Sequence, residues 1–337
     1  MGKYKLINNV LGWVTFAISS IVYLMTMEPT ASFWDCGEFI SSAYKLEVGH
    51  PPGAPFFMLT ANLFTQFASD PSQVAVMVNS MSALFSGLTI LFLFWSITHL
   101  ARRILVNEGE EISNSQLITI MGSGLVGALA YTFSDTFWFS AVEGEVYAYS
   151  SLFTAVVFWL ILKWEAVADK PHADRWMVLI AYLMGLSIGV HLLNLLCIPA
   201  IVLVYYYKKY PNPTLKGTFV ALFISFAIIA VMMYGVVQGL VEVCGWFELL
   251  FVNGMGMPYN SGVFAYVVVL LGVIAWAIYE TMTSNPNKVR MNIAFILSVT
   301  LIGIPFIGSG YVIGILLIAA LTAYLFLSKR TSIEVMN

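Results

Sequence analysis

PSQVAVMVNSMSALFSGLTILFLFWSITHLA, residues 71–101, contains no aspartate, glutamate, lysine or arginine. About 20 consecutive apolar residues span the hydrocarbon core of a bilayer as a helix, so this run is long enough to cross a membrane. Further runs without these four residue types cover much of the chain: residues 6–27, 112–134, 146–162, 176–207, 217–241, 249–279 and 291–328. The sequence therefore predicts an all-α, polytopic membrane protein.

The composition supports this prediction. Soluble domains have about 25% charged residues, whereas this chain of 337 residues has 10%, with 60% hydrophobic residues and a mean hydropathy of +0.86. So few charges cannot form a polar surface, and lipid must cover much of the protein. The net charge of −3 gives no basis for nucleic-acid binding. The three cysteines, Cys36, Cys197 and Cys244, lack the spacing of a metal site or a disulfide framework.

Lysine and arginine predict the orientation, because cytoplasmic loops are enriched in both. Of the 15 basic residues, 14 fall on one side if residues 176–207 and 291–328 each cross twice, and only Lys45 falls on the other. The first of these runs would turn near His191 and Asn194, and the second at Gly308-Ser309-Gly310. We therefore expect a helix bundle of about ten crossings with both termini in the cytoplasm.

The whole chain, residues 1–337, is predicted to form a single transmembrane domain without a separate soluble domain. No small-residue cleavage site follows the first span, so this span is expected to remain as an anchor.

Acidic residues concentrate on the opposite, outer side of the predicted membrane. Ten of the 18 fall there: Glu28, Asp35, Glu38, Glu47, Asp70, Asp135, Glu143, Glu145, Glu242 and Glu248. A single lysine cannot neutralise them. We expect some of these carboxylates to be solvated and others to serve a function.

The first outer loop has the densest polar sequence, residues 27–39, and runs on to Gly49-His50-Pro51-Pro52-Gly53. Its apolar residues have the spacing of one helical face: Phe39, Ile40, Ala43, Tyr44 and Leu46. A short amphipathic helix along the membrane surface is predicted here, ended by Gly49 and the prolines.

Asp35 and Glu38 lie three residues apart at the start of that helix and allow two interpretations. They can form a capping box that satisfies free amide groups. Alternatively, Asp35 is a general base at the mouth of a membrane cavity. The two roles are compatible, because amide groups would fix the direction of the side chain.

Glu143 and Glu145 precede the run that begins at residue 146, and His191 lies inside the run 176–207. The two acids can simply stabilise a helix amino terminus through its macrodipole, although the position of Glu145 next to the hydrocarbon favours a function. His191 is either a hydrogen-bonded histidine between helices or an ionisable site residue at membrane depth. The motifs of soluble nucleotide, zinc-protease and serine-hydrolase chemistry are missing from the sequence.

Trp34-Asp35-Cys36-Gly37-Glu38-Phe39, followed by Ala43-Tyr44, Gly49 and His50-Pro51-Pro52-Gly53, resembles a signature of a known family. That family contains the eukaryotic transmembrane protein O-mannosyltransferase and its bacterial relatives. Residues 141–147, with their Glu145-Val146-Tyr147 core, resemble its second motif. Gly185-Leu186 followed by His191 is similar to its third.

This resemblance implies a glycosyltransferase C-like fold. It also implies an enzyme that moves a sugar, a hexose such as mannose, from a polyprenyl-phosphate carrier to a hydroxyl group of an exported protein or glycan. Asp35 occupies the place of the acid that activates the acceptor hydroxyl in an inverting reaction, and Glu38 is the second implied catalytic residue. The implied substrate-binding residues are Trp34, Lys45, His50, Glu143, Glu145, Tyr147 and His191.

The expected partners are the lipid-linked donor, the exported acceptor and membrane lipids. The expected location is a bacterial inner membrane, with the site on the periplasmic side. The donor phosphate needs a positive charge, which Lys45, a divalent cation, helix amino termini or a region missing from this chain can supply. No metal-site motif is present in the sequence. Bacterial relatives often continue into a large soluble carboxy-terminal region, so this chain would be either a truncated or a minimal form.

Two rival functions remain at this stage. A membrane transporter or a flippase for lipid-linked glycans also contains intramembrane ionisable groups and broken helices, but usually near the membrane midplane. A non-catalytic assembly subunit would tolerate replacement of Asp35.

Overall fold

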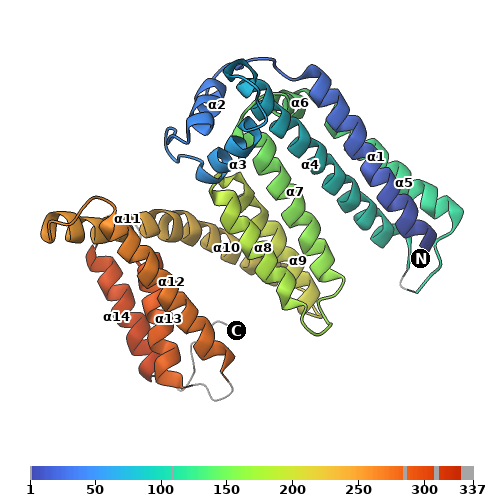
Figure 1. The fold of residues 1–337 in the computed structure, drawn as a ribbon. Helices are drawn as coiled ribbons and strands as arrows, with labels where there is room; N and C mark the ends of the chain where they lie inside the picture. Colours follow the sequence, from blue (N-terminus) through green and yellow to red (C-terminus); the bar gives the residue numbers. More distant parts are fainter. Residues whose placement is uncertain (1, 108, 284–286, 307–310, 328–337) are drawn as a thin grey trace. The chain divides into compact units, whose positions relative to one another are not determined.

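A computed structural model describes residues 2–107, 109–283, 287–306 and 311–327 (Figure 1). The regular structure in these ranges is helical, and no strand occurs in them. The chain forms two compact units, residues 1–222 and 223–337, each of which is described by itself. The all-α prediction is confirmed.

Unit 1 is built on α4 (Val74–Leu105), which packs against α1 (Gly2–Thr26), α5 (Asn114–Thr132) and α7 (Val146–Glu165). The side chains of Ile90 and Phe94 are fully buried between these helices. Small residues let the helices approach closely, since a Cβ atom at Gly87 would collide with Ser20 of α1. Packing of apolar side chains and small residues therefore holds this bundle together.

Basic residues gather at one end of this bundle. Lys3 Nζ donates to Asn114 Oδ1 at 3.2 Å, and Arg103 at the end of α4 pairs with Glu165 at the end of α7. The other end carries α2 (Cys36–Lys45), α3 (Pro55–Thr65) and α6 (Asp135–Ala141) (Figure 1). Unit 1 thus separates these bases from the Asp35 region, as predicted, while the assignment of membrane sides stays a prediction.

The run 176–207 is broken near His191, as its charge pattern predicts. Helix α8 (Asp174–Ile188) ends there, and the 3₁₀ helix η2 (Leu192–Cys197) leads into α9 (Ile198–Lys209). The far end of α9 returns to the residues that follow α7, where Lys208 pairs with Asp169 at 2.7 Å and Lys209 Nζ donates to the Ala168 carbonyl at 3.0 Å. The turn between α8 and η2 therefore lies at the end of unit 1 that carries the predicted site.

Unit 2 is also helical. Helix α10 (Leu215–Ala230) begins in unit 1 and continues through the π-helical η3 (Val231–Val237), α11 (Gln238–Glu248) and the π-helical η4 (Leu249–Gly254). The remaining helices are α12 (Ser261–Met282), α13 (Lys288–Ile302) and α14 (Tyr311–Leu327). Val243, Tyr266 and Phe306 form its core. The predicted turn at Gly308-Ser309-Gly310 lies outside the described residues.

Six helical stretches in the described ranges are long and apolar enough to cross a membrane: residues 2–26, 71–105, 146–165, 192–209, 215–254 and 261–282. The first 3₁₀ helix, η1 (Pro71–Gln73), is part of the second of them. A seventh results if α5 and α6, which are bent by 67°, count as one broken span. Helices α8 and α13 have 15 residues each and α14 has 17. The finding supports a membrane protein, while the count of ten crossings, the glycosyltransferase C-like fold and the single domain over residues 1–337 stay predictions.

Candidate functional site

The predicted amphipathic helix is α2, which begins directly after Asp35. Phe39, Ile40 and Ala43 are its buried face and pack in one cluster with Phe57 of α3 and Val78 of α4. The helix ends at Lys45, and the next residue, Leu46, takes the left-handed conformation with φ +54°. It therefore stops four residues before Gly49, through a local turn of the backbone. This packing fixes the position of Asp35 and Glu38 at the end of unit 1.

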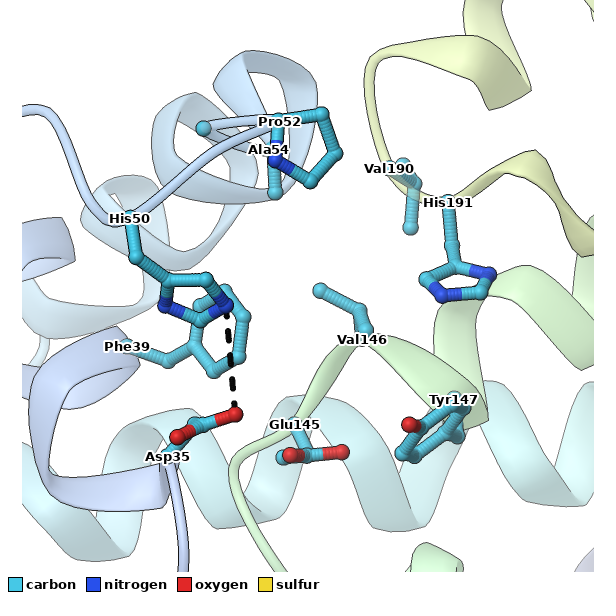
Figure 2. Close-up of a pocket in the computed structure, with 11 residues that line it drawn as sticks. Asp35, Phe39, His50, Pro52, Ala54, Glu145, Val146, Tyr147, Val190 and His191 are labelled. Carbon is cyan, nitrogen blue, oxygen red and sulfur yellow. Dashed lines mark ion pairs between the residues drawn. The ribbon is translucent and has the colours of Figure 1, made fainter.

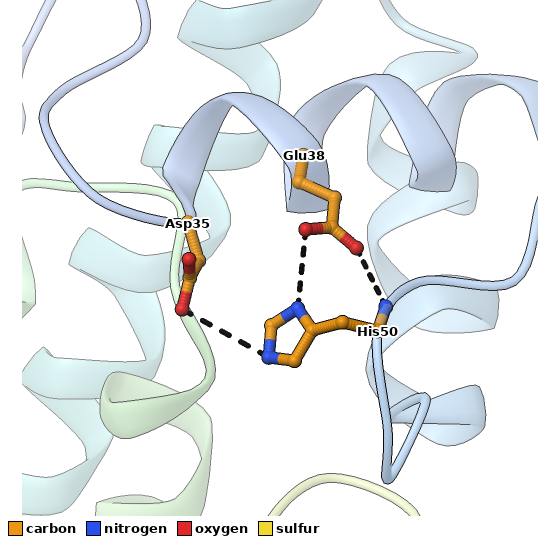
Figure 3. A group of neighbouring side chains, drawn as sticks. All are labelled: Asp35, Glu38 and His50. Carbon is orange, nitrogen blue, oxygen red and sulfur yellow. Dashed lines mark hydrogen bonds and ion pairs between the residues drawn. The ribbon is translucent and has the colours of Figure 1, made fainter.

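Glu38 binds His50, and it does so through two contacts (Figure 3). The His50 backbone N–H donates to Glu38 Oε1 at 2.6 Å, and His50 Nδ1 lies 3.1 Å from Glu38 Oε2. Those two hydrogen bonds, the backbone one first, lower the pKa of the Glu38 carboxyl group. Gly49 makes the approach possible, because a Cβ atom there would lie 3.1 Å from Glu38 Oε1.

The capping-box interpretation does not describe these two acids. Asp35 occupies the N-cap position of α2, but its side chain makes no capping hydrogen bond. Both oxygens of the Glu38 carboxylate contact His50 and not the amide groups at the start of α2. The opposite ring atom, His50 Nε2, faces Asp35, with 3.9 Å between it and Asp35 Oδ2. The three side chains form a row with the imidazole between the two carboxylates (Figure 3).

Backbone contacts join the segment before α2 to the segment before α7. The Glu28 N–H donates to the Val142 carbonyl at 3.0 Å. Asn79 of α4 donates through Nδ2 to the carbonyls of Glu28 at 2.6 Å and Thr30 at 3.0 Å. Gly144 packs against the same asparagine, since a Cβ atom there would lie 2.8 Å from Asn79 Oδ1. These contacts set Glu143 and Glu145 next to the Asp35 region.

Glu143 and Glu145 are both buried, with 5% and 6% of their surfaces exposed. Burial raises the pKa of Glu143, whose carboxyl group interacts with the side chains of Ser32 and Cys36. Burial, followed by the nearby charges of Glu143 and Asp35, raises the pKa of Glu145 to about 7. Glu145 sits at the N-cap of α7, yet its side chain makes no capping bond, and its Oε2 atom has no hydrogen-bond partner.

Cys36 lies beneath this site, with 1% of its surface exposed. Burial, with the charges of Glu143 and Glu145, raises the pKa of its thiol to about 12. A thiol in this environment is a packing group and not a nucleophile, because nucleophilic attack requires the thiolate.

A cavity of about 90 Å³, room for several water molecules, brings five of the predicted residues together (Figure 2). They are Asp35, His50, Glu145, Tyr147 and His191. The other lining residues are Phe39, Pro52, Gly53, Ala54, Val146 and Val190, which the sequence did not single out as site residues. Each is near a predicted residue in the chain, so the motifs themselves were the available signal.

His191 reaches the cavity because α3 begins against the turn after α8. The Phe56 N–H donates to the Gly189 carbonyl at 2.7 Å. The His191 ring packs 5.4 Å from the Tyr147 ring, and its Nδ1 accepts from the Leu193 N–H at 3.2 Å. Among the described residues, the hydrogen-bond partner of the ring thus lies in the turn of His191 itself, in contrast to the interhelical alternative.

The remaining predicted residues do not line this cavity. Glu38 contacts the lining residue His50, and Glu143 contacts Ser32 and Cys36. Lys45 is exposed at the last turn of α2. Trp34 has 90% of its surface exposed and a backbone φ of +59°. The cavity therefore combines carboxylates and imidazoles on an apolar frame, which suits proton transfer from a hydroxyl group or binding of a cation.

Comparison with known proteins places this chain in a family. Residues 35–214 match the family model described as the protein O-mannosyl-transferase TMEM260 N-terminal domain. The chain is 27% identical over 185 residues to a Dictyostelium discoideum protein named protein O-mannosyl-transferase tmem260, and 28% identical over 174 residues to the Mus musculus protein of that name.

These matches cover 53% and 51% of this chain, but 20% and 22% of the two relatives. The chain thus spans about a fifth of the length of the curated relatives it matches. No solved structure matches it.

Proposed function

Because the chain belongs to the family of the protein O-mannosyl-transferase TMEM260 N-terminal domain, which matches residues 35–214, we propose that it is a membrane glycosyltransferase. It transfers a hexose such as mannose from a polyprenyl-phosphate carrier to a hydroxyl group of an exported protein or glycan. The names of the two relatives support the sugar and the reaction class.

The observation that carries the proposal is the position of Asp35. Its side chain is 52% exposed, so an acceptor hydroxyl group can reach it from the aqueous side. It also lines the cavity together with Glu145 and His191, which come from other parts of unit 1. A carboxylate that is both accessible and held by packed elements fits a general base.

In the proposed reaction, Asp35 accepts the proton of the acceptor hydroxyl group as its oxygen attacks the anomeric carbon of the sugar. The new carbon–oxygen bond forms while the bond from that carbon to the carrier's phosphate oxygen breaks. The polyprenyl phosphate leaves with the electron pair, and the configuration at the anomeric carbon inverts. His50, fixed by Glu38 and facing Asp35, keeps the carboxylate directed at the acceptor.

Reconstitution of the full chain in lipid nanodiscs tests this proposal. The assay supplies a radiolabelled polyprenyl-phosphate mannose and peptides that contain serine and threonine. Asp35→Asn is expected to lower turnover at least about 100-fold, the scale of general-base catalysis, with unchanged melting. Glu47→Gln is the matched control, because Glu47 is an exposed acid in the same segment and does not line the cavity.

Normal turnover by Asp35→Asn would remove the catalytic role of this residue. Movement of the lipid-linked sugar across the bilayer without transfer to any peptide would instead favour the transporter or flippase.

A further inference from the structure

The cavity has an unbalanced charge. Asp35 and Glu145 line it, and Glu38 lies directly behind His50, yet none of the described residues that line it is a lysine or arginine. Lys45, the basic residue expected to serve the donor phosphate, is exposed elsewhere on α2. Carboxylates packed this closely repel one another and a phosphate alike. The cavity therefore lacks a positive charge that could offset these carboxylates, and a bound cation would supply it.

The geometry around His50 is the one used to direct a metal-binding imidazole. A histidine that binds a metal through one ring nitrogen usually donates its other N–H to a carboxylate, which fixes the ring. Here His50 Nδ1 lies at hydrogen-bond distance, 3.1 Å, from Glu38 Oε2. The other ring nitrogen, Nε2, faces Asp35 Oδ2 at 3.9 Å. One ligand atom each from Asp35, Glu38 and His50 lie within 4.8 Å of one another.

An independent observation comes from the second polar segment. Glu145 is 6% exposed, lines the same cavity as Asp35 and His50, and has an Oε2 atom without a hydrogen-bond partner. Figure 2 shows it between Asp35 and Tyr147. Buried carboxylate oxygens are normally paired or bound to a metal, because an unpaired one is costly.

We propose that Asp35, His50 Nε2 and Glu145 bind a divalent cation, with Glu38 as the residue that orients the imidazole. One imidazole with two carboxylates suits Mn²⁺ or Zn²⁺ better than Ca²⁺ or Mg²⁺, which prefer oxygen ligands alone. Metal–ligand distances of about 2.0–2.2 Å require the Asp35 and His50 atoms, now 3.9 Å apart, to approach by a few tenths of an ångström. The Glu145 carboxylate is not in the group of ligand atoms within 4.8 Å of one another, so it has to swing toward them or bind the cation through a water molecule. Both side chains are about half exposed and have room to do so.

The role of this cation rests on the proposed function. A cation between Asp35 and Glu145 would neutralise the donor phosphate, which the described lining residues do not do themselves. Asp35 has two carboxylate oxygens, so Oδ2 can bind the cation while Oδ1 accepts the proton of the acceptor hydroxyl group.

Metal binding can be measured without any transfer assay. The full chain, purified in detergent and stripped with a chelator, is titrated with Mn²⁺ alone while electron paramagnetic resonance reports free Mn²⁺. We expect one bound ion per chain, displaced by Zn²⁺ and hardly by Ca²⁺. Asp35→Asn, His50→Ala and Glu145→Gln should each weaken binding at least tenfold, and Glu38→Gln about 10–100-fold.

Glu47→Gln and Asp70→Asn are the controls, because both are exposed acids that do not line the cavity, and both should bind Mn²⁺ as the unchanged chain does. Absence of binding above a detergent blank would overturn the cation site, as would equal binding by all variants.

The two proposals fail separately. Loss of transfer in Asp35→Asn without any Mn²⁺ binding would leave the glycosyltransferase and remove the metal. Mn²⁺ binding that depends on these ligands, in a chain that transfers no sugar, would leave the metal site and remove the proposed reaction.

Discussion

Two polar segments meet at the cavity and use the same acidic chemistry in opposite environments. In the first, residues 28–54, Asp35 and Glu38 are exposed and engage His50. In the second, residues 134–145, Glu143 and Glu145 are buried against the first segment and α4. Exposed carboxylates contribute little to stability, whereas buried groups are sensitive to every change of size and charge.

The difference assigns separate tasks to the two segments. Substitutions at the buried end of the second segment, residues 143–145, should appear first as lost stability. Substitutions of the exposed acids of the first segment, Asp35 and Glu38, should leave melting unchanged and appear in turnover. Of the four acids Asp35, Glu38, Glu143 and Glu145, only Glu145 is both buried and part of the cavity wall. Its substitution should therefore affect both stability and turnover.

The largest effect is expected from Glu143→Lys. The longer side chain and its ammonium group would be buried beside Ser32 and Cys36. The carboxylates of Glu28 and Glu145 are close enough to offset part of the charge, but removing an ammonium group from water still costs several kcal/mol. Thermal melting of the full chain in detergent should show a large loss. Glu47→Lys makes the same change at an exposed position and should alter stability by no more than about 0.5 kcal/mol. Equal melting of the two variants would contradict the proposed difference between the segments.

The next effect is expected from Gly144→Ala. The added Cβ atom would lie 2.8 Å from Asn79 Oδ1, 3.0 Å from Val78 Cγ1 and 3.1 Å from Ile40 Cγ1. Overpacking of this kind costs about 1–3 kcal/mol. Melting in detergent again measures it.

The first segment provides the matched control, Gly37→Ala. A Cβ atom at Gly37 would meet only Ala31 Cβ, at 3.8 Å, and Gly37 lies inside α2. Alanine is the better helix former by up to about 1 kcal/mol, so Gly37→Ala should be neutral or stabilising. A destabilised Gly37→Ala with an unaffected Gly144→Ala would reverse the comparison.

These contrasts also show what the sequence could and could not predict. The helix α2 and the break at His191 were predictable, because each follows from local spacing or from the sorting of lysine and arginine. The end of α2 before Leu46 was not, because a left-handed residue other than glycine carries no sequence signal. Helix α6 was missed because its residues continue an apolar, aromatic stretch, and the bend before it depends on tertiary packing.

The candidate site divides in the same way. The ionisable residues Asp35, His50, Glu145 and His191 were predictable, because charged or imidazole groups beside apolar runs are conspicuous. Their apolar neighbours, such as Val146 and Val190, were not, because only the facing elements decide which apolar residue lines a cavity. That Glu38 contacts His50 and does not cap α2 also required the structure, since both interpretations fit the same spacing.

A moderate effect, confined to activity, is expected from Glu38→Gln. The glutamine oxygen can still accept from the His50 backbone N–H, but its NH2 group would donate to Nδ1. The ring proton would then sit on Nε2, the atom that faces Asp35, so the imidazole would have the opposite tautomer. We expect turnover to fall about tenfold, with unchanged melting because Glu38 is exposed. Asp70→Asn is the control, since Asp70 accepts a local hydrogen bond from Ser72 away from the cavity. A parallel loss of melting temperature would make Glu38 a structural residue.

The smallest effect on stability is expected at Trp34, which is 90% exposed and has a φ of +59°. Trp34→Ala should change the free energy of unfolding by no more than about 0.5 kcal/mol, and Trp34→Gly should stabilise slightly, because glycine adopts positive φ without strain. An exposed tryptophan next to Asp35 in a strained conformation has two explanations. It either anchors the chain in the membrane interface, where tryptophan is enriched, or contacts a substrate. A higher KM at unchanged kcat in both variants would show substrate contact, whereas unchanged kinetics with weaker retention in lipid would show an anchor.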